Sequence, residues 1–173
     1  MHHITAHGLG GIPLFPAADD RNVAVQLIGK EIARSGWKCL EYCVMTTHYH
    51  LVVELTDHDT LSTGVGHLNR LYASYFNGSY ARRGHAFESR FDDVLVDTDE
   101  YRLEVVRYVA LNPTRAAICR LPEQYPWSAY GSIVGLFPDD PIVDLATALA
   151  PFGGSRDAYR AYVEELDPRL RRR

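Results

Sequence analysis

Two runs of apolar and β-branched residues, 38–45 and 48–55, are separated by only two threonines, and this spacing constrains the possible folds more than any other feature of the chain. A two-residue link between two strands allows only a tight turn, so we predict an antiparallel β-hairpin. His48 and His50 begin the second strand. Side chains two residues apart in a strand emerge on the same face of a sheet, so both imidazoles are expected to point the same way.

Strand-like and helix-like patterns alternate through the rest of the first 112 residues. The predicted elements are strands over residues 2–6 and 90–96, helices over 20–35, from Asp59 or Thr60 to about 80, and from a cap at Thr98 to Asn112-Pro113, and loops over 7–16 and 81–88. This order, βαββαβα, predicts an α+β fold of the ferredoxin-like kind, in which helices pack on a four-stranded antiparallel sheet. The histidine pair would then lie on a central strand.

A shorter and less regular pattern follows the third helix. Pro122, Pro126 and the short segment 127–134 are expected to form a turn of helix that covers an edge of the core, with Trp127 as its anchor. We therefore expect one domain over residues 1–136 and a mostly helical C-terminal extension over 137–173. The helices expected within this extension run over residues 142–149 and from a cap at Ser155 to about residue 166.

Length and composition limit the chain to a few classes of protein. With 173 residues, 46% of them hydrophobic, it can bury one substantial core. Its cysteines, Cys39, Cys43 and Cys119, are odd in number and lack a CxxC spacing, which argues against a disulfide framework and a zinc knuckle. The start of the chain shows no leader pattern, and no apolar run approaches the ~20 residues that cross a bilayer. A cytoplasmic protein with no membrane partner is expected.

The charge of the chain is unevenly distributed. A net charge of −4 is the wrong sign for a protein that binds nucleic acid by bulk electrostatics. Residues 65–120, however, carry eight basic and seven acidic side chains, and all but two basic residues of the chain are arginines, which suit bidentate contacts with phosphate. The candidate DNA contacts in this part are Arg82, Arg83, Arg90 and Arg115. The tail at residues 169–173 is a second arginine cluster, which is either a solvated end or a further DNA contact.

The spacing of Tyr108 and Asn112 places a phenol and a carboxamide on one face of the third helix, one turn apart. Two imidazoles from one strand make half of a metal site, and a phenol is a candidate nucleophile. Each piece also has an ordinary interpretation: the histidines as surface residues, Tyr108 as core packing, and Asn112 before Pro113 as a helix stop. Taken alone, these residues leave both interpretations open.

Five segments in sequence order strengthen the chemical interpretation. They are HHITAHG at the start, YCVMTTHYHLVVE around the histidines, LNRLYASYFN in the second helix, GHAFESRFDDVLVDTDEY across the basic loop and fourth strand, and RYVALNPTRAAI around the tyrosine. With these segments, residues 1–131 resemble the REP-associated tyrosine transposases, a branch of the single-tyrosine HUH transposases of the insertion sequence 200-like superfamily.

The resemblance implies a site and a reaction. In this chain His48, His50 and Asn112 would bind a divalent ion, Mg²⁺ or Mn²⁺, and Tyr108 would attack DNA beside it. The expected enzyme is a site-specific endonuclease and ligase, a transposase that cleaves and rejoins single-stranded DNA through a 5′-phosphotyrosine intermediate. The expected partner is single-stranded DNA with imperfect hairpins (REP-like palindromes), and the protein would be a monomer or a homodimer.

The chain departs from the pattern of this family at two places. Thr46-Thr47 stands where the family usually has Pro-Asn, and the first loop, HGLGGIPLF, lacks the usual Asn and Arg residues. The first change is expected to alter the turn. The second leaves the preferred DNA sequence open.

Two other functions stay open at the level of sequence. One is a hairpin-DNA-binding protein of the same descent with little or no catalytic activity. The other is a metal-dependent phosphodiesterase that uses water as its nucleophile. Tyr108 would be dispensable in such a phosphodiesterase, so a Tyr108→Phe variant separates it from the transposase.

Overall fold

A four-stranded antiparallel sheet forms the centre of the fold, and the computed structural model describes residues 1–57, 60–88 and 90–165. The strands are β1 (His2–His7), β2 (Lys38–Val44), β3 (His48–Glu54) and β4 (Asp92–Leu95), in the order β2-β3-β1-β4. The main helices are α1 (Ala18–Ser35), α2 (Thr60–Ser79) and α3 (Asp99–Ala110). The predicted α+β fold of the ferredoxin-like kind is confirmed, and β3 is a central strand.

The hairpin of β2 and β3 has the expected tight turn. Met45 N–H donates to the carbonyl of His48 at 2.8 Å, and this bond closes the turn. β2 lies at one edge of the sheet. Val143 forms an isolated parallel bridge with Cys39 on this strand, which covers part of an edge that would otherwise expose its backbone groups.

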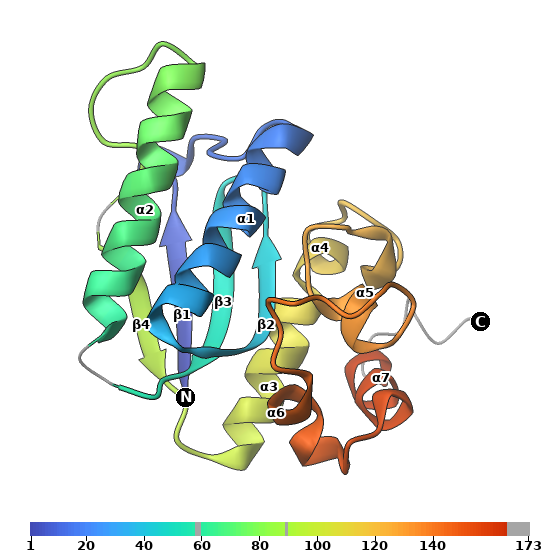
Figure 1. Ribbon diagram of the computed structural model, residues 1–173. Coiled ribbons are helices and arrows are strands. Elements are labelled where there is room, and N and C mark those ends of the chain that lie inside the picture. Colours follow the sequence, from blue (N-terminus) through green and yellow to red (C-terminus); the bar gives the residue numbers. More distant parts are fainter. Residues whose placement is uncertain (58–59, 89, 166–173) are drawn as a thin grey trace.

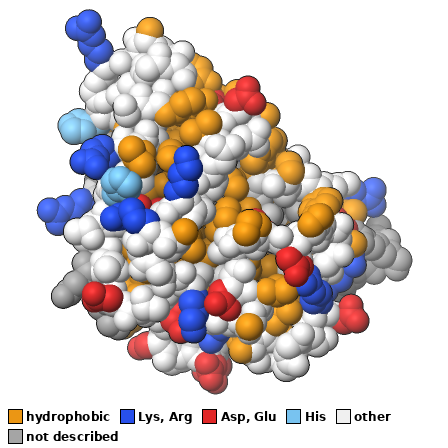
Figure 2. All heavy atoms as spheres, viewed as in Figure 1, with side chains coloured by type: hydrophobic (Ala, Val, Ile, Leu, Met, Phe, Trp, Pro, Cys, Tyr) orange, Lys and Arg blue, Asp and Glu red, His pale blue; other side chains and the backbone are white. Residues whose placement is uncertain are grey.

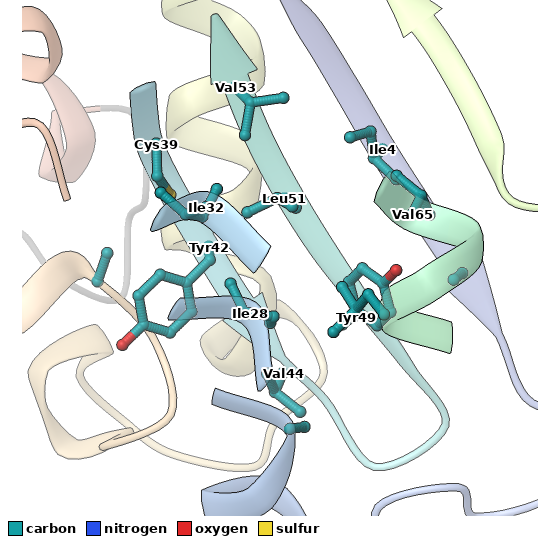
Figure 3. Close-up of a cluster of buried hydrophobic side chains, with 14 of the residues drawn as sticks. Ile4, Ile28, Ile32, Cys39, Tyr42, Val44, Tyr49, Leu51, Val53 and Val65 are labelled. Atoms are coloured by element: carbon teal, nitrogen blue, oxygen red, sulfur yellow. The ribbon is translucent and has the colours of Figure 1, made fainter. Parts of the chain in front are cut away.

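Alternation along β3 divides its side chains between the two faces of the sheet. Tyr49 and Leu51 point to the face covered by α1 and α2, where both are buried (Figure 3). α3 packs on the other face through residues that include Val105 (Figure 1). His48 and His50 alternate with Tyr49 and Leu51, so the two imidazoles share a face, as predicted, and this is the face that α3 covers.

Local sequence explains where the helices begin and end. The Asp20 carboxylate accepts a hydrogen bond from Ala17 N–H at 2.8 Å, so α1 begins two residues earlier than predicted. Gly36 ends α1 in a left-handed conformation with φ 66°. The predicted cap of α3 is confirmed, because the Thr98 hydroxyl accepts from Tyr101 N–H at 3.2 Å. The possible cap of α2 at Asp59 lies outside the described residues.

Several other predicted boundaries also differ from the structure. The segment 7–16 is not all loop, because Leu9–Gly11 form a short 3₁₀ helix, η1, in which Gly10 and Gly11 adopt positive φ. Strand β4 is shorter than the predicted 90–96. The third helix does not end at Asn112-Pro113: α3 ends at Ala110, and Asn112 begins a further turn, α4 (Asn112–Arg115). Proline is compatible with a first helical turn, where its missing N–H has no partner to lose.

The C-terminal part of the chain is helical, as predicted, and it packs beside β2 and α3 (Figure 1). Its elements are η2 (Pro122–Gln124), α5 (Tyr130–Ile133), α6 (Leu145–Leu149), η3 (Ala150–Phe152) and α7 (Arg156–Glu164). The predicted cap Ser155 accepts a hydrogen bond from Ala158 N–H. The arginine tail at 169–173 lies outside the described residues. No helix of the described residues combines the length and apolar character needed to cross a membrane.

Candidate active site

Strands β1 and β3 together present a row of histidine and threonine side chains on the α3 face. The register places His7 opposite His48 and Thr5 opposite His50. Because side chains of directly opposite residues share a face, His3 joins this row through alternation along β1. The row lines a cavity of about 540 Å³. The cavity is lined by His3, Thr5, His7, His48, His50, Asp92, Tyr101, Glu104, Val105 and Tyr108.

The structure brings His48, His50 and Asn112 together. The Nε2 atoms of His48 and His50 lie 3.1 Å apart, and the Asn112 amide nitrogen lies 3.0 Å from His50 Nε2. Asn112 is only 8% exposed, so the surrounding residues hold its side chain in this position. The short helix α4 therefore delivers the carboxamide to the histidine pair, even though the predicted end of the third helix was wrong.

These three side chains fit a divalent ion. Neighbouring ligand atoms of an octahedral site with metal–ligand distances of ~2.1 Å lie about 3.0 Å apart, which matches the two separations around His50. A half-turn of the Asn112 amide exchanges its nitrogen and oxygen, so the oxygen can serve as the ligand. Within the described ranges, no group of three or more His, Cys, Asp and Glu side chains is arranged to hold a metal ion. The Asn112 amide, 3.0 Å from Nε2 of His50, is the candidate for a third protein ligand.

Burial keeps both imidazoles neutral. It lowers the pKa of His48 to about 4, with a smaller contribution from the neighbouring His7. It lowers the pKa of His50 to about 2, and the adjacent His48 and His3 add to the effect. A neutral imidazole offers a nitrogen lone pair to a metal, whereas a protonated one does not. Near neutral pH both side chains are therefore in the form that binds metal ions.

Tyr108 stands at the mouth of the same cavity. Its ring meets the His50 ring edge to face, with centroids 5.3 Å apart and planes at 84°. The Arg115 guanidinium carbon lies 5.5 Å from the centre of the Tyr108 ring. The side chain is 41% exposed, so core packing does not account for it. Of the four candidate DNA-contact arginines, Arg115 is the one that the structure places against the tyrosine.

The other three arginines belong to the segment between α2 and β4. Arg82, Arg83 and Arg90 are exposed, and the Arg82 guanidinium carbon lies 5.7 Å from the ring of Phe76. In Figure 2, Lys, Arg and His side chains gather on the side of the molecule where α2 lies. The segment is tied to the end of β1, since Glu88 N–H donates to the His7 carbonyl at 2.9 Å. It therefore runs beside the histidine row.

Sequence reasoning missed several residues of this site, namely His3, Thr5, His7 and Thr47. The Thr5 hydroxyl lies 3.2 Å from Nδ1 of His50, and the Thr47 hydroxyl lies 3.0 Å from Nδ1 of His48. The alternation His3-Thr5-His7 was a usable signal, because it marks one face of the first strand. The register between β1 and β3, which places this face beside His48 and His50, could not be predicted from the sequence.

Comparisons with known proteins found one matching family and a solved structure with a similar fold. A family model described as "Transposase IS200 like" matches residues 16–112, more than half of the chain. One solved structure with a similar fold is a REP-associated tyrosine transposase bound to a REP hairpin, with a TM-score of 0.61 and 19% sequence identity. The similarity covers 80% of this chain and 82% of that one. A comparison with curated proteins found no significant match.

Proposed function

The chain belongs to the IS200-like transposase family, and from this premise we propose that it is a metal-dependent strand transferase that cleaves and rejoins single-stranded DNA at hairpins through Tyr108. The observation that carries the proposal is the position of Tyr108, edge-on to His50 at 5.3 Å and exposed in the cavity that His48 and His50 line. A nucleophile, a candidate metal site and an open cavity thus meet at one place.

Three side chains are assigned to the metal. His48 and His50 would bind Mg²⁺ or Mn²⁺ through their Nε2 atoms, which lie 3.1 Å apart. Asn112 would bind it through its amide oxygen after a half-turn of the amide, whose nitrogen lies 3.0 Å from Nε2 of His50. A bound ion of this kind supplies Lewis-acid stabilisation of charge on a phosphate oxygen. Nitrogen ligands suit Mn²⁺ better than Mg²⁺, so Mn²⁺ is the better choice for experiments.

Tyr108 is assigned the nucleophilic step. Its Oη attacks the phosphorus, so an Oη–P bond forms while the bond from phosphorus to the 3′ oxygen breaks. The phenol proton passes to water, and the released 3′ oxygen takes up a proton to become a hydroxyl. The product is a 5′-phosphotyrosine, and attack by a 3′-hydroxyl on this linkage reverses the step and rejoins the strand.

Arginines are assigned the contacts with DNA. Arg115 lies over the Tyr108 ring and suits a phosphate near the nucleophile. Arg82, Arg83 and Arg90 suit the strand on its way out of the cavity, because their segment is bonded to β1 next to the histidine row. A hairpin as the substrate is supported by the REP hairpin bound to the structural relative.

The proposed site is complete within one chain, and we assign the catalytic unit to residues 1–136. Its metal ligands lie on β3 and α4, and its nucleophile lies on α3. Residues 137–173 would be an extension, whose described helices α6 and α7 pack against β2 and α3. A monomer can therefore carry out both halves of the reaction, and a homodimer would contain two complete sites.

The test is a Tyr108→Phe variant, incubated with Mn²⁺ and a pool of single-stranded hairpins. Phenylalanine keeps the ring against His50, so hairpin binding is expected to persist while cleavage disappears. Mass spectrometry of digested wild-type reactions is expected to find a nucleotide on the peptide that contains Tyr108. The matched control is Tyr101→Phe, because Tyr101 lies on the same helix and lines the same cavity.

Three results would contradict the proposal. Cleavage that survives in the Tyr108→Phe variant would point to the phosphodiesterase that uses water. An adduct on Tyr101 would identify Tyr101, and not Tyr108, as the nucleophile. Hairpin binding by the wild type with no cleavage and no adduct would favour a DNA-binding protein of the same descent.

A further inference from the structure

Each histidine assigned to the metal has a threonine hydroxyl at its other ring nitrogen. We infer that Thr47 and Thr5 are positioning residues, which accept hydrogen bonds from Nδ1–H of His48 and His50 and so hold the Nε2 lone pair of each ring toward the ion. The inference rests on the proposed function for the presence of that ion. It goes further in assigning a role to two residues outside the catalytic set.

The first of the two contacts joins Thr47 to His48. The Thr47 hydroxyl lies 3.0 Å from Nδ1 of His48, and it is the one partner of that nitrogen among the described residues. The opposite nitrogen, Nε2, faces Nε2 of His50 at 3.1 Å. A neutral imidazole carries one N–H, and the hydrogen bond made by one nitrogen determines whether the other holds a lone pair. A proton at Nδ1 leaves Nε2 free for the metal.

His50 has the same arrangement, with two possible hydrogen-bond partners at its Nδ1. Its Nδ1 lies 3.2 Å from the Thr5 hydroxyl and 3.1 Å from Nε2 of His3, whose ring stacks on it at 5.2 Å. The Asn112 amide nitrogen lies 3.0 Å from Nε2 of His50, and in this orientation its N–H donates to a lone pair on Nε2. After the half-turn that presents the amide oxygen to a metal ion, Nε2 needs the same lone pair to bind the ion. Both orientations agree with a proton on Nδ1, where the Thr5 hydroxyl and Nε2 of His3 are available as acceptors.

The other tautomer of His48, with its proton on Nε2, would form different hydrogen bonds with the same neighbours. If His48 carried its proton on Nε2, it would donate to Nε2 of His50, and Thr47 would donate its hydroxyl proton to Nδ1 instead of accepting. That arrangement satisfies both rings without a metal. It would have to be broken before an ion could bind, so the two tautomers predict different behaviour of the metal-free protein and of Thr47 variants.

The turn that contains Thr47 is anchored through its backbone. The Thr47 carbonyl accepts from Gly8 N–H, and the Thr46 carbonyl accepts from Phe15 N–H, both at 2.8 Å. A Thr47→Val change removes the hydroxyl but keeps the shape and these backbone bonds. Thr46→Val makes the same chemical change one residue away, where no side-chain hydrogen bond links the threonine to a histidine in the part of the chain that the structure describes. It is the matched control.

The experiment compares wild type, Thr47→Val, Thr47→Ser and Thr46→Val by two measurements. Long-range ¹H–¹⁵N correlation spectra of the metal-free protein identify which imidazole nitrogen carries the proton, with His48 assigned from a His48→Asn spectrum. Titration with Mn²⁺ then gives the affinity. We expect the Nδ1–H tautomer at both histidines in the wild type. Thr47→Val should bring Nε2–H signal to His48 and weaken Mn²⁺ binding about tenfold or more, and Thr47→Ser should restore both.

A wild-type His48 that carries its proton on Nε2 overturns the inference, and so does a Thr47→Val variant that binds Mn²⁺ as tightly as the wild type. Equal losses in Thr46→Val and Thr47→Val would also overturn it, because they would show a general effect on the turn. These results are separate from the Tyr108 test. DNA joined to Tyr108 in a protein whose His48 is protonated on Nε2 would leave the proposed function standing and remove only the role of the threonines.

Discussion

Asn112 has a backbone role and a side-chain role that can be separated. Its carbonyl accepts from the N–H of Ala116, the residue after α4, and its side-chain amide lies beside Nε2 of His50. An alanine at this position keeps the backbone bond and removes the amide. The helix-stop interpretation and the metal-ligand interpretation therefore predict opposite results for one substitution.

We predict that Asn112→Ala weakens Mn²⁺ binding by about 1–3 kcal/mol, the cost of losing one polar partner at a buried site, and that it changes the stability of the metal-free protein little. Isothermal titration and thermal unfolding without metal measure the two effects. Asn69→Ala is the matched control, because the Asn69 carbonyl accepts from the Tyr49 hydroxyl on the opposite face of the sheet. It should lower stability and leave Mn²⁺ binding unchanged.

A large loss of stability in metal-free Asn112→Ala, together with normal Mn²⁺ binding, would mean that the residue only shapes the chain between α3 and α4. At the scale of residues, the sequence pointed to His48 and His50 through their spacing within one strand, and to Tyr108 and Asn112 through a spacing of four residues that the structure divides between α3 and α4. The contacts of Thr5 and His3 with His50 could not be predicted from the sequence, since they depend on the register between two strands and join residues 45 and 47 positions apart.

Helix α3 lies between the sheet and the C-terminal helix α7. Its inner side packs on the sheet through Val105, whereas Arg107 reaches outward to α7. The Arg107 Nε–H donates to the Tyr162 carbonyl at 3.0 Å, and the guanidinium carbon lies 3.6 Å from the centre of the Tyr162 ring. Because Arg107 immediately precedes Tyr108, the same contact that docks α7 also holds the helix that carries the proposed nucleophile.

Arg107→Gln is predicted to lower the free energy of unfolding by about 1–2 kcal/mol, because it removes a cation–π contact and a hydrogen bond. Glutamine and arginine have similar helix propensities, so the helix itself should be unaffected. Chemical denaturation measures the change. The control is Arg70→Gln on the exposed surface of α2, which should change stability by less than about 0.5 kcal/mol.

Equal effects of the two arginine substitutions would show that the contact with Tyr162 does not support α3. The sequence predicted α3 through the spacing of its apolar residues and its threonine cap, and both features are local. It did not predict that Asn112 and Pro113 begin a new turn of helix, because proline is compatible with both the end of one helix and the start of the next. It also did not predict the partner of Arg107, which is 55 residues away.

The C-terminal extension shares its core with the sheet. Leu149, Tyr159 and Val163 belong to the same buried cluster as Leu51 of β3. The Tyr159 hydroxyl donates to a carboxyl oxygen of Glu41 in β2 at 2.5 Å, and neither residue is exposed to solvent. Sequence patterns predicted the helices of this extension and treated it as an appendix. A buried link between residues 118 positions apart has no local signal.

Glu41 makes the stability of the whole molecule depend on pH. Burial raises its pKa from 4.5 to about 8, although the hydrogen bond from Tyr159 works in the opposite direction. Between these two values the folded protein holds a proton that the unfolded chain has released. Stability from this group is therefore fully present below about pH 4.5 and is lost as the pH rises toward 8. The slope is at most about 1.4 kcal/mol per pH unit.

Glu41→Gln removes this dependence while keeping a side chain of the same shape that still accepts from Tyr159. The free energy of unfolding of the variant relative to wild type is predicted to rise steadily from pH 5 to pH 8, so the variant gains most at the alkaline end. Denaturation curves at several pH values give this difference. The contributions of the buried histidines cancel in it, because both proteins contain them.

The control is Glu100→Gln, the same change at an exposed site, which should give a nearly constant difference. A flat difference for Glu41→Gln as well would mean that Glu41 is ionised in the folded protein, held by donors such as the Tyr159 hydroxyl and Tyr42 N–H.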